Sequence, residues 1–305
     1  MKYFLAILSI FSLTMSPSNS HACACGCGVF DVGTSSMLPT TAGGSFFFEF
    51  NFLDQNKNRY RGSADSADNN PDKEIRTSFY KVGGQYMFNR NWGVQAEIPY
   101  WSRHFSTTDD AGNPAAFDHS AMGDIRLKAI YTGLFEDMST GLTFGLKLPT
   151  GDFSYSNFDP DTQIGSGSTD LLIGVYHMGK ITEDNLWNWF MQLNVDQPII
   201  AQTNYLPGNE INAVIGTYYN GWKFGSENKI APILELLTAV RGADSGLKSM
   251  PGDSGYRRLL VSPGFELALG GFRFIGDVQV PIYQYFNGDQ LAAPIGYKLA
   301  TMFNF

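Results

Sequence analysis

The sequence predicts an all-β fold, a transmembrane antiparallel up-and-down β-barrel of about twelve strands with short periplasmic turns and long extracellular loops. Three observations lead to this prediction. Apolar and polar residues alternate in about twelve segments, each near the length that a tilted membrane-spanning strand needs. The connections between these segments are alternately long and short. Charged residues form only 16% of the chain, against about 25% in soluble domains, and aromatic residues form 14%.

The N-terminus has the three parts of a secretory signal peptide. Lys2 supplies a positive charge, an apolar run follows, and Ser20 and Ala22 suit the positions before a cleavage site. We therefore expect residues 1–22 to be removed, so that the mature chain begins at Cys23. The apolar run is shorter than the roughly 20 residues of a membrane-spanning helix. A lipid anchor on Cys23 is an alternative, although the leucine expected three residues earlier is missing.

Residues 23–44 precede the barrel, show no clear periodicity and are expected to lie in the periplasm or in the lumen. Three thiols two residues apart can converge as soft ligands for Cu or Zn, which makes Cys23, Cys25 and Cys27 a candidate metal site. The alternative is an oxidised pair with one thiol left over, because the envelope is oxidising. The segment also carries apolar residues that suit a luminal plug: Val29, Phe30, Val32 and Met37.

The predicted barrel, residues 45–305, begins and ends on the two clearest strands. The first strand places four phenylalanines, from Phe46 to Phe52, opposite Glu49 and Asn51. A row of four rings suits lipid, whereas in water it would form an aggregation-prone patch. The last strand, Gly296–Phe305, alternates in the same way. It resembles the closing strand of bacterial outer-membrane barrels, in which a terminal aromatic residue belongs to the signal read by the barrel assembly machinery.

The strands between these two show the same alternation, with a largely apolar face opposite a polar or charged one. They are expected at Arg76–Phe88, Trp92–Arg103, Gly123–Phe135, Thr140–Leu148, Ser168–Met178, Trp187–Asp196, Ile211–Asn220, Lys229–Arg241, Arg258–Leu269 and Phe272–Tyr283. The long connections are Asp54–Ile75, Phe105–Met122, Gly151–Gly167, Pro198–Glu210, Gly242–Tyr256 and Gln284–Ile295. A soluble sandwich has no reason to sort its loops by length, so the sorting favours a barrel with both termini in the periplasm.

The polar faces of the strands predict the lining of the lumen. The lumen-facing candidates are Glu49, Lys81, Glu97, Arg103, Asp124, Arg126, Lys128, Lys147, Asp170, Glu235, Arg258, Glu266, Arg273, Asp277 and Lys298. By register, several aromatic residues also face inward: Phe79, Trp101, Tyr176, Phe190, Tyr218 and Tyr283. Eight strands leave an interior that side chains fill and sixteen leave an aqueous channel, so twelve predict a narrow or partly plugged pore. The charges either select permeants or pair across the lumen and close it.

Three stretches with turn glycines and alternating residues carry a family resemblance. They are Met122–Tyr131, Gly145–Asp152 and Gly165–Gly174, and Pro281–Leu299 adds a weaker match. They resemble the outer-membrane transporter family associated with the meta-pathway of phenol degradation, over most of residues 46–305. The resemblance implies a channel for passive or facilitated passage of small hydrophobic or aromatic solutes. The cysteine-rich start is not a feature of that family.

Other functions are less well supported by the sequence. A net charge of −8 argues against nucleic acid as a partner. His104 and Ser106 have the spacing of barrel phospholipases, but the surrounding Asn-Gly signature is missing, so no enzyme activity and no catalytic residue is predicted. The alternative function is a structural or metal- and redox-linked barrel that binds a periplasmic partner through its cysteines. Expected partners are outer-membrane lipid, lipopolysaccharide bridged through acidic loops, and a small-molecule permeant; no cofactor is expected beyond a metal at the cysteines.

Overall fold

The computed structural model describes residues 30, 33, 35–64, 70–109, 111–225 and 228–305. The predicted signal peptide, its cleavage site and the three cysteines lie outside the described residues. The two helical turns of the described part, η1 (Ser35–Met37) and η2 (Pro251–Asp253), are short. Neither is long or apolar enough to cross a membrane as a helix.

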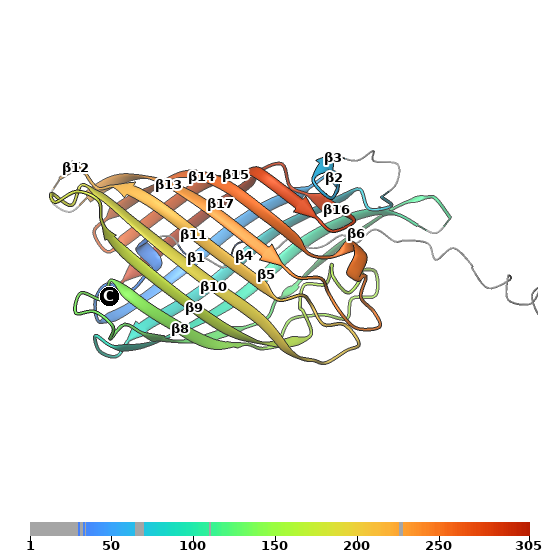
Figure 1. Cartoon of the computed structure of the whole chain (residues 1–305), viewed down its shortest axis with the longest axis horizontal. Coiled ribbons are helices and arrows are strands. Elements are labelled where there is room, and N and C mark those ends of the chain that lie inside the picture. The colour runs from blue at the N-terminus through green and yellow to red at the C-terminus, as the bar shows by residue number, and fades with distance from the viewer. Residues whose placement is uncertain (1–29, 31–32, 34, 65–69, 110, 226–227) are drawn as a thin grey trace, which may run out of the picture.

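Nearly all remaining structure is antiparallel β-sheet, rolled into an elongated barrel (Figure 1). The barrel strands are β1 (Gly43–Gln55), β4 (Glu74–Met87), β5 (Trp92–Thr108), β6 (Pro114–Met122), β7 (Arg126–Tyr131), β8 (Thr140–Lys147), β9 (Ser168–Lys180), β10 (Trp187–Ala201), β11 (Glu210–Tyr219), β12 (Trp222–Phe224), β13 (Asn228–Arg241), β14 (Tyr256–Leu269), β15 (Phe272–Phe286) and β17 (Gly296–Asn304). A small second sheet of β2 (Lys57–Tyr60), β3 (Ser63–Ala64) and β16 (Asp289–Ala292) lies at the loop end.

These strands occupy twelve positions around a closed barrel, because β6 and β7 share one position and β12 prolongs the position of β11. The seam closes where β1 pairs with both β4 and β17, from Ser45 opposite Asn304 to Leu53 opposite Gly296. At the end of the seam near the short turns, the backbone amide of Gly44 donates to the Phe305 carbonyl, and the Phe305 amide donates to the Gly44 carbonyl, each at 2.9 Å. The predicted fold, an antiparallel up-and-down barrel with an even number of strands, is confirmed.

The side chains divide between the two faces of the barrel as the alternation predicts. On β1, Phe46 is 61% exposed on the outside, whereas Glu49 is 2% exposed in the interior. Lipid offers no hydrogen bonds to a strand edge, so only a closed sheet satisfies the backbone in a membrane. Aromatic pairs gather at the short turns, as with Trp92 and Tyr131, whose ring centroids lie 4.8 Å apart. An apolar belt bounded by aromatic residues is the exterior of an outer-membrane barrel.

Two local features differ from the sequence prediction. The stretch Phe105–Met122, expected as a loop, is mostly strand, because β5 runs on to Thr108 and pairs there with β6. Tyr283 was expected to face the lumen but is 51% exposed on the outside. The register between β14 and β15 shifts by one residue at Ile282, and such a bulge moves the following side chains to the other face.

Candidate solute pathway in the barrel lumen

One side of the lumen carries paired charges. We call this surface the charged wall, formed by Glu49, Lys81, Glu97, Arg126, Lys128, Lys147, Asp170 and Asp196 on strands β1 to β10. Lys81 Nζ lies 3.1 Å from Glu49 Oε1, and Lys128 Nζ lies 3.3 Å from Glu97 Oε1. Further along, Arg126 Nη2 lies 2.9 Å from Asp196 Oδ2, and Lys147 pairs with Asp170. Each cation therefore has a carboxylate partner, and the wall presents little uncompensated charge.

The remaining predicted luminal charges also lie buried or half-buried within the barrel. Lys298 is next to Asp277 on the neighbouring strand and interacts with Glu49 and Glu235. Near the turns, Arg273 Nη1 lies 2.8 Å from Glu266 Oε1, and Ser36 of the N-terminal segment donates to the same carboxylate. These contacts are internal pairs, so the role of these charges in selecting a permeant stays a prediction.

Two of the predicted residues hold an extracellular loop inside the mouth of the barrel. Asp124 lies in the break between β6 and β7, and its carboxylate accepts hydrogen bonds from the amides of Gly151 and Ser166 at 2.9 and 2.8 Å. Arg103 donates to Thr77 Oγ1 at 3.0 Å and to the carbonyl of Thr162. The loop 148–167 is thus tied to the barrel at Gly151 and Ser166, near its two ends, and at Thr162 between them.

A second tie to this loop lies further out. His119 Nε2 is 2.9 Å from Asp152 Oδ2, and the Tyr155 ring stacks on the imidazole with centroids 4.0 Å apart. A hydrogen bond from the Ser154 amide, aided by His119, holds the pKa of Asp152 below its usual value. The carboxylate therefore stays ionised at neutral pH, and its contact with His119 ties the loop to β6.

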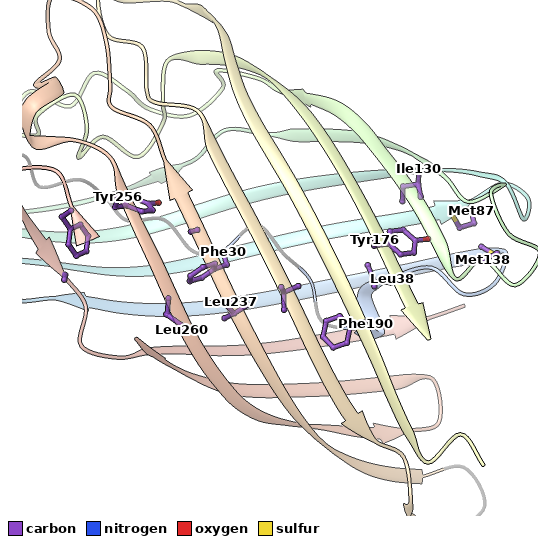
Figure 2. Close-up of a cluster of buried hydrophobic side chains, with 14 residues drawn as sticks. Phe30, Leu38, Met87, Ile130, Met138, Tyr176, Phe190, Leu237, Tyr256 and Leu260 are labelled. Carbon is purple, nitrogen blue, oxygen red and sulfur yellow. The ribbon is translucent and has the colours of Figure 1, made fainter. Parts of the chain in front are cut away.

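A cluster of apolar side chains also lies in the lumen, partly on the same strands as the charged wall. We call it the apolar column, formed by Met87, Ile130, Met138, Tyr176, Phe190, Val214, Leu237, Ala239, Tyr256, Leu260, Phe286 and Ala292. It runs from Met87 and Met138 near the short turns, past Tyr176 and Phe190, to Tyr256 near the loops (Figure 2). These side chains face the lumen, yet they are buried from solvent because they belong to one packed cluster.

The N-terminal segment lies along this column. Phe30 and Leu38 pack into the same cluster, Leu38 toward the turns and Phe30 toward the loops (Figure 2). The Gly33 amide donates to Gln192 Oε1 at 2.9 Å, and the Tyr176 hydroxyl lies 3.5 Å from the Pro39 carbonyl. The described part of the segment is therefore inside the lumen.

The segment leaves separate spaces in the lumen. A cavity of about 180 Å³ lies toward the loops, lined by charged-wall residues together with Phe30, Phe79 and Trp101. A second space of about 410 Å³ lies toward the turns, next to Leu38, Pro39 and Glu266. Between them is a pocket of only about 40 Å³. The lumen is therefore constricted around the N-terminal segment.

Of the apolar column, Tyr176 and Phe190 were predicted to face inward, whereas aliphatic members such as Leu237 were not. An inward apolar residue has the same alternation pattern as one that faces lipid, and only a local break in alternation distinguishes them. Leu236 and Leu237 are adjacent, as are Leu259 and Leu260, so each pair places one leucine on either face. Within the described residues, no group of three or more His, Cys, Asp or Glu side chains is arranged to hold a metal.

Solved structures with a similar barrel exist. The outer membrane channel of Pseudomonas putida F1 aligns with a TM-score of 0.68 at 13% identity, over 90% of this chain and 100% of its own. The two chains share one fold. The β domain of the Bordetella autotransporter BrkA aligns with a TM-score of 0.52 at 12% identity, over 87% of this chain and 100% of its own. No protein-family model matches the sequence, and no curated protein is similar to it.

Proposed function

We propose that this protein is an outer-membrane channel for the passage of small hydrophobic or aromatic solutes. The apolar column carries the proposal, because it lines the lumen with apolar side chains from Met87 near the turns to Tyr256 near the loops. A solute that leaves water for such a surface gains the free energy of apolar burial. The paired ions of the charged wall offer no comparable attraction for ions in bulk solution.

The likeness to the Pseudomonas putida channel supports the barrel fold, and extending its channel role to this chain belongs to the proposal. Membership of the transporter family associated with phenol degradation is a finer proposal that depends on the stretches with turn glycines described above. The same holds for recognition of β17 by the barrel assembly machinery and for contact of the loops with lipopolysaccharide. Metal binding by the three cysteines stays a prediction, which metal analysis of the purified protein and of a Cys→Ser variant would test.

An enzymatic role has less support. His104 Nδ1 lies 2.8 Å from Asp118 Oδ1 on the outside of the β5–β6 hairpin. This pair belongs to a row of charges at the rim, which also includes Glu74 and Arg76. A lipid-hydrolysis assay of the protein and of His104→Ala would test the enzymatic role, since an activity that vanishes in the variant would favour an enzyme.

The channel proposal is tested by uptake through an intact outer membrane, because hydrophobic solutes cross simple phospholipid vesicles unaided. Cells that lack other hydrocarbon channels would express this protein or an empty vector, and uptake of radiolabelled toluene would be measured. We expect faster uptake with the protein, together with low single-channel conductance in planar bilayers. Uptake equal to that of the vector, combined with a large ion conductance, would instead identify an aqueous pore.

A further inference from the structure

We propose that the lumen around Arg258 is a binding subsite for a single neutral aromatic ring, and that Phe30 occupies it as an internal substitute for the permeant. The inference rests on the proposed function and identifies where in the channel an aromatic solute is held. Arg258 was predicted from sequence only as one of many luminal charges.

The geometry at Arg258 is that of a cation between two rings. The guanidinium carbon lies 4.9 Å from the centroid of the Phe30 ring and 4.5 Å from that of Tyr256. Both distances are within the range in which a cation is attracted to a ring face. Arg258 is 5% exposed and Tyr256 is 1% exposed. The interaction is therefore shielded from water, which strengthens it.

The surroundings hold the arginine in place and leave room for a ring. The Tyr256 hydroxyl donates to Glu210 Oε1 at 3.1 Å, and Arg258 Nη2 lies 3.5 Å from that hydroxyl. Ala239 stands opposite Arg258 on the neighbouring strand, and its small side chain leaves space beside the guanidinium. Leu237 and Leu260 complete the apolar side of the subsite (Figure 2).

Phe30 comes from the N-terminal segment and not from the barrel wall. Its ring belongs to the apolar cluster and also lines the cavity of about 180 Å³ toward the loops. Removing the ring would therefore join the subsite to this cavity. A ring that arrives from the loop end would meet the same cation, the same tyrosine and the same leucines that Phe30 contacts.

The alternative is that Phe30 only anchors the segment by apolar contact. Leu38 provides the matched control, since it is a buried apolar residue of the same segment that packs at the other end of the cluster. Truncating either residue would leave an apolar hole, but only the hole at Phe30 would face Arg258. Affinity for a flat aromatic ring over a saturated ring of similar size then separates recognition from simple cavity filling.

The experiment uses the full-length protein in detergent and its variants Phe30→Ala and Leu38→Ala. Toluene and methylcyclohexane are the probes, and their binding is measured by the shift of the thermal unfolding midpoint with concentration. We expect Phe30→Ala to bind toluene about tenfold more tightly than methylcyclohexane. Leu38→Ala should show no such preference. Equal affinities of Phe30→Ala for the two probes would overturn the proposal.

Arg258→Met in the Phe30→Ala background should abolish the preference, and Arg258→Lys should keep part of it because it retains the charge. A preference unchanged by Arg258→Met would also refute the subsite. Toluene uptake by the unaltered protein separates this result from the proposed function. A selective subsite without uptake would refute the channel role alone, and uptake without selectivity in Phe30→Ala would refute the subsite alone.

Discussion

The charged wall and the apolar column line one lumen, partly from the same strands, but their side chains are stabilised in opposite ways. In the charged wall each ion is compensated by a neighbour on the next strand, as in the pair of Lys147 and Asp170. In the apolar column the side chains pack on one another and on Phe30 and Leu38. The difference teaches that a barrel interior need not be uniformly polar. The ion pairs join neighbouring strands, and the apolar column is the surface on which the proposed passage of a solute depends.

The largest expected effect comes from breaking an ion pair of the charged wall. Lys147→Met would leave Asp170, which is almost fully buried, without its cationic partner, although the hydrogen bond from Ser168 would remain. We expect a loss of about 3–5 kcal/mol in the free energy of unfolding, measured in detergent with urea. The double variant Lys147→Met with Asp170→Leu should recover most of the loss. If the single variant lost under about 1 kcal/mol, the wall would not depend on its pairing.

The loop end of the barrel contains a buried carboxyl, Asp72, whose burial outweighs the contacts that favour its charged form. Burial raises the pKa of Asp72 to about 7, a hydrogen bond from Thr107 opposes this shift, and Asp159 and Asp161 add to it. The folded state therefore binds the proton more tightly than the unfolded state, whose pKa is near 3.8. The stability that this group contributes is full below about pH 4, falls as pH rises to about 7 and is constant above that.

Asp72→Asn should remove this fall in stability between pH 4 and pH 7. The variant is then more stable than the parent at pH 8 by roughly 2–4 kcal/mol and similar to it at pH 4. Urea unfolding midpoints of both proteins between pH 4 and pH 8 provide the measurement. Parallel pH profiles for the two proteins would show that Asp72 is not the group responsible.

A matched pair of added charges compares the apolar column with the charged wall directly. Leu237→Asp places a carboxylate in the apolar column, and Gln95→Asp places one beside Glu97 and Lys128. We expect toluene uptake to fall about 30-fold in the first variant, because an ionised group there keeps water in the pathway. Uptake should change less than about twofold in the second. Equal losses in both variants would mean that solutes do not follow the apolar column.

The smallest effect is expected where Arg103 of the barrel holds the loop 148–167. Thr77→Val removes the hydroxyl that accepts a hydrogen bond from Arg103 Nε while keeping the shape of the side chain. The expected loss in unfolding free energy is about 1 kcal/mol. Hydrogen exchange of the loop amides should increase at Thr162 and Gln163, whose carbonyls Arg103 also contacts. Unchanged exchange there would show that the remaining contacts suffice to hold the loop.

Sequence patterns predicted the barrel well because lipid and the closed sheet impose a period of two on every strand. Phe46 and Glu49 could be assigned to their faces without any knowledge of their partners. Seven of the eight charged-wall residues were lumen-facing candidates from register, and Asp196, the partner of Arg126, was not among them. The pattern also did not show which ion meets which. The loop 148–167 could not be placed, since the contacts of Asp124 and Arg103 with its backbone join residues far apart in the chain.

Register predicted the inward positions of Tyr176 and Phe190, but the aliphatic part of the apolar column escaped prediction for a physical reason. A leucine such as Leu237 satisfies the same apolar preference whether it meets lipid or another side chain. Tyr283 was misplaced because a bulge shifts register by one residue and leaves no unambiguous mark in the sequence. Phe30 was among the apolar residues that suggested a luminal plug, but it has no periodic neighbours, so its contact with Arg258 could not be predicted.

The seam between β1 and β17 has a consequence for how the molecule is made. The last residue of the chain binds Gly44, only a few positions beyond the segment that lies within the lumen. Residues 35–42 lie beside this end of the seam, at the space that is also lined by Asn304 and Phe305. Closure of the sheet and entry of the N-terminal segment into the lumen therefore take place at the same end of the barrel.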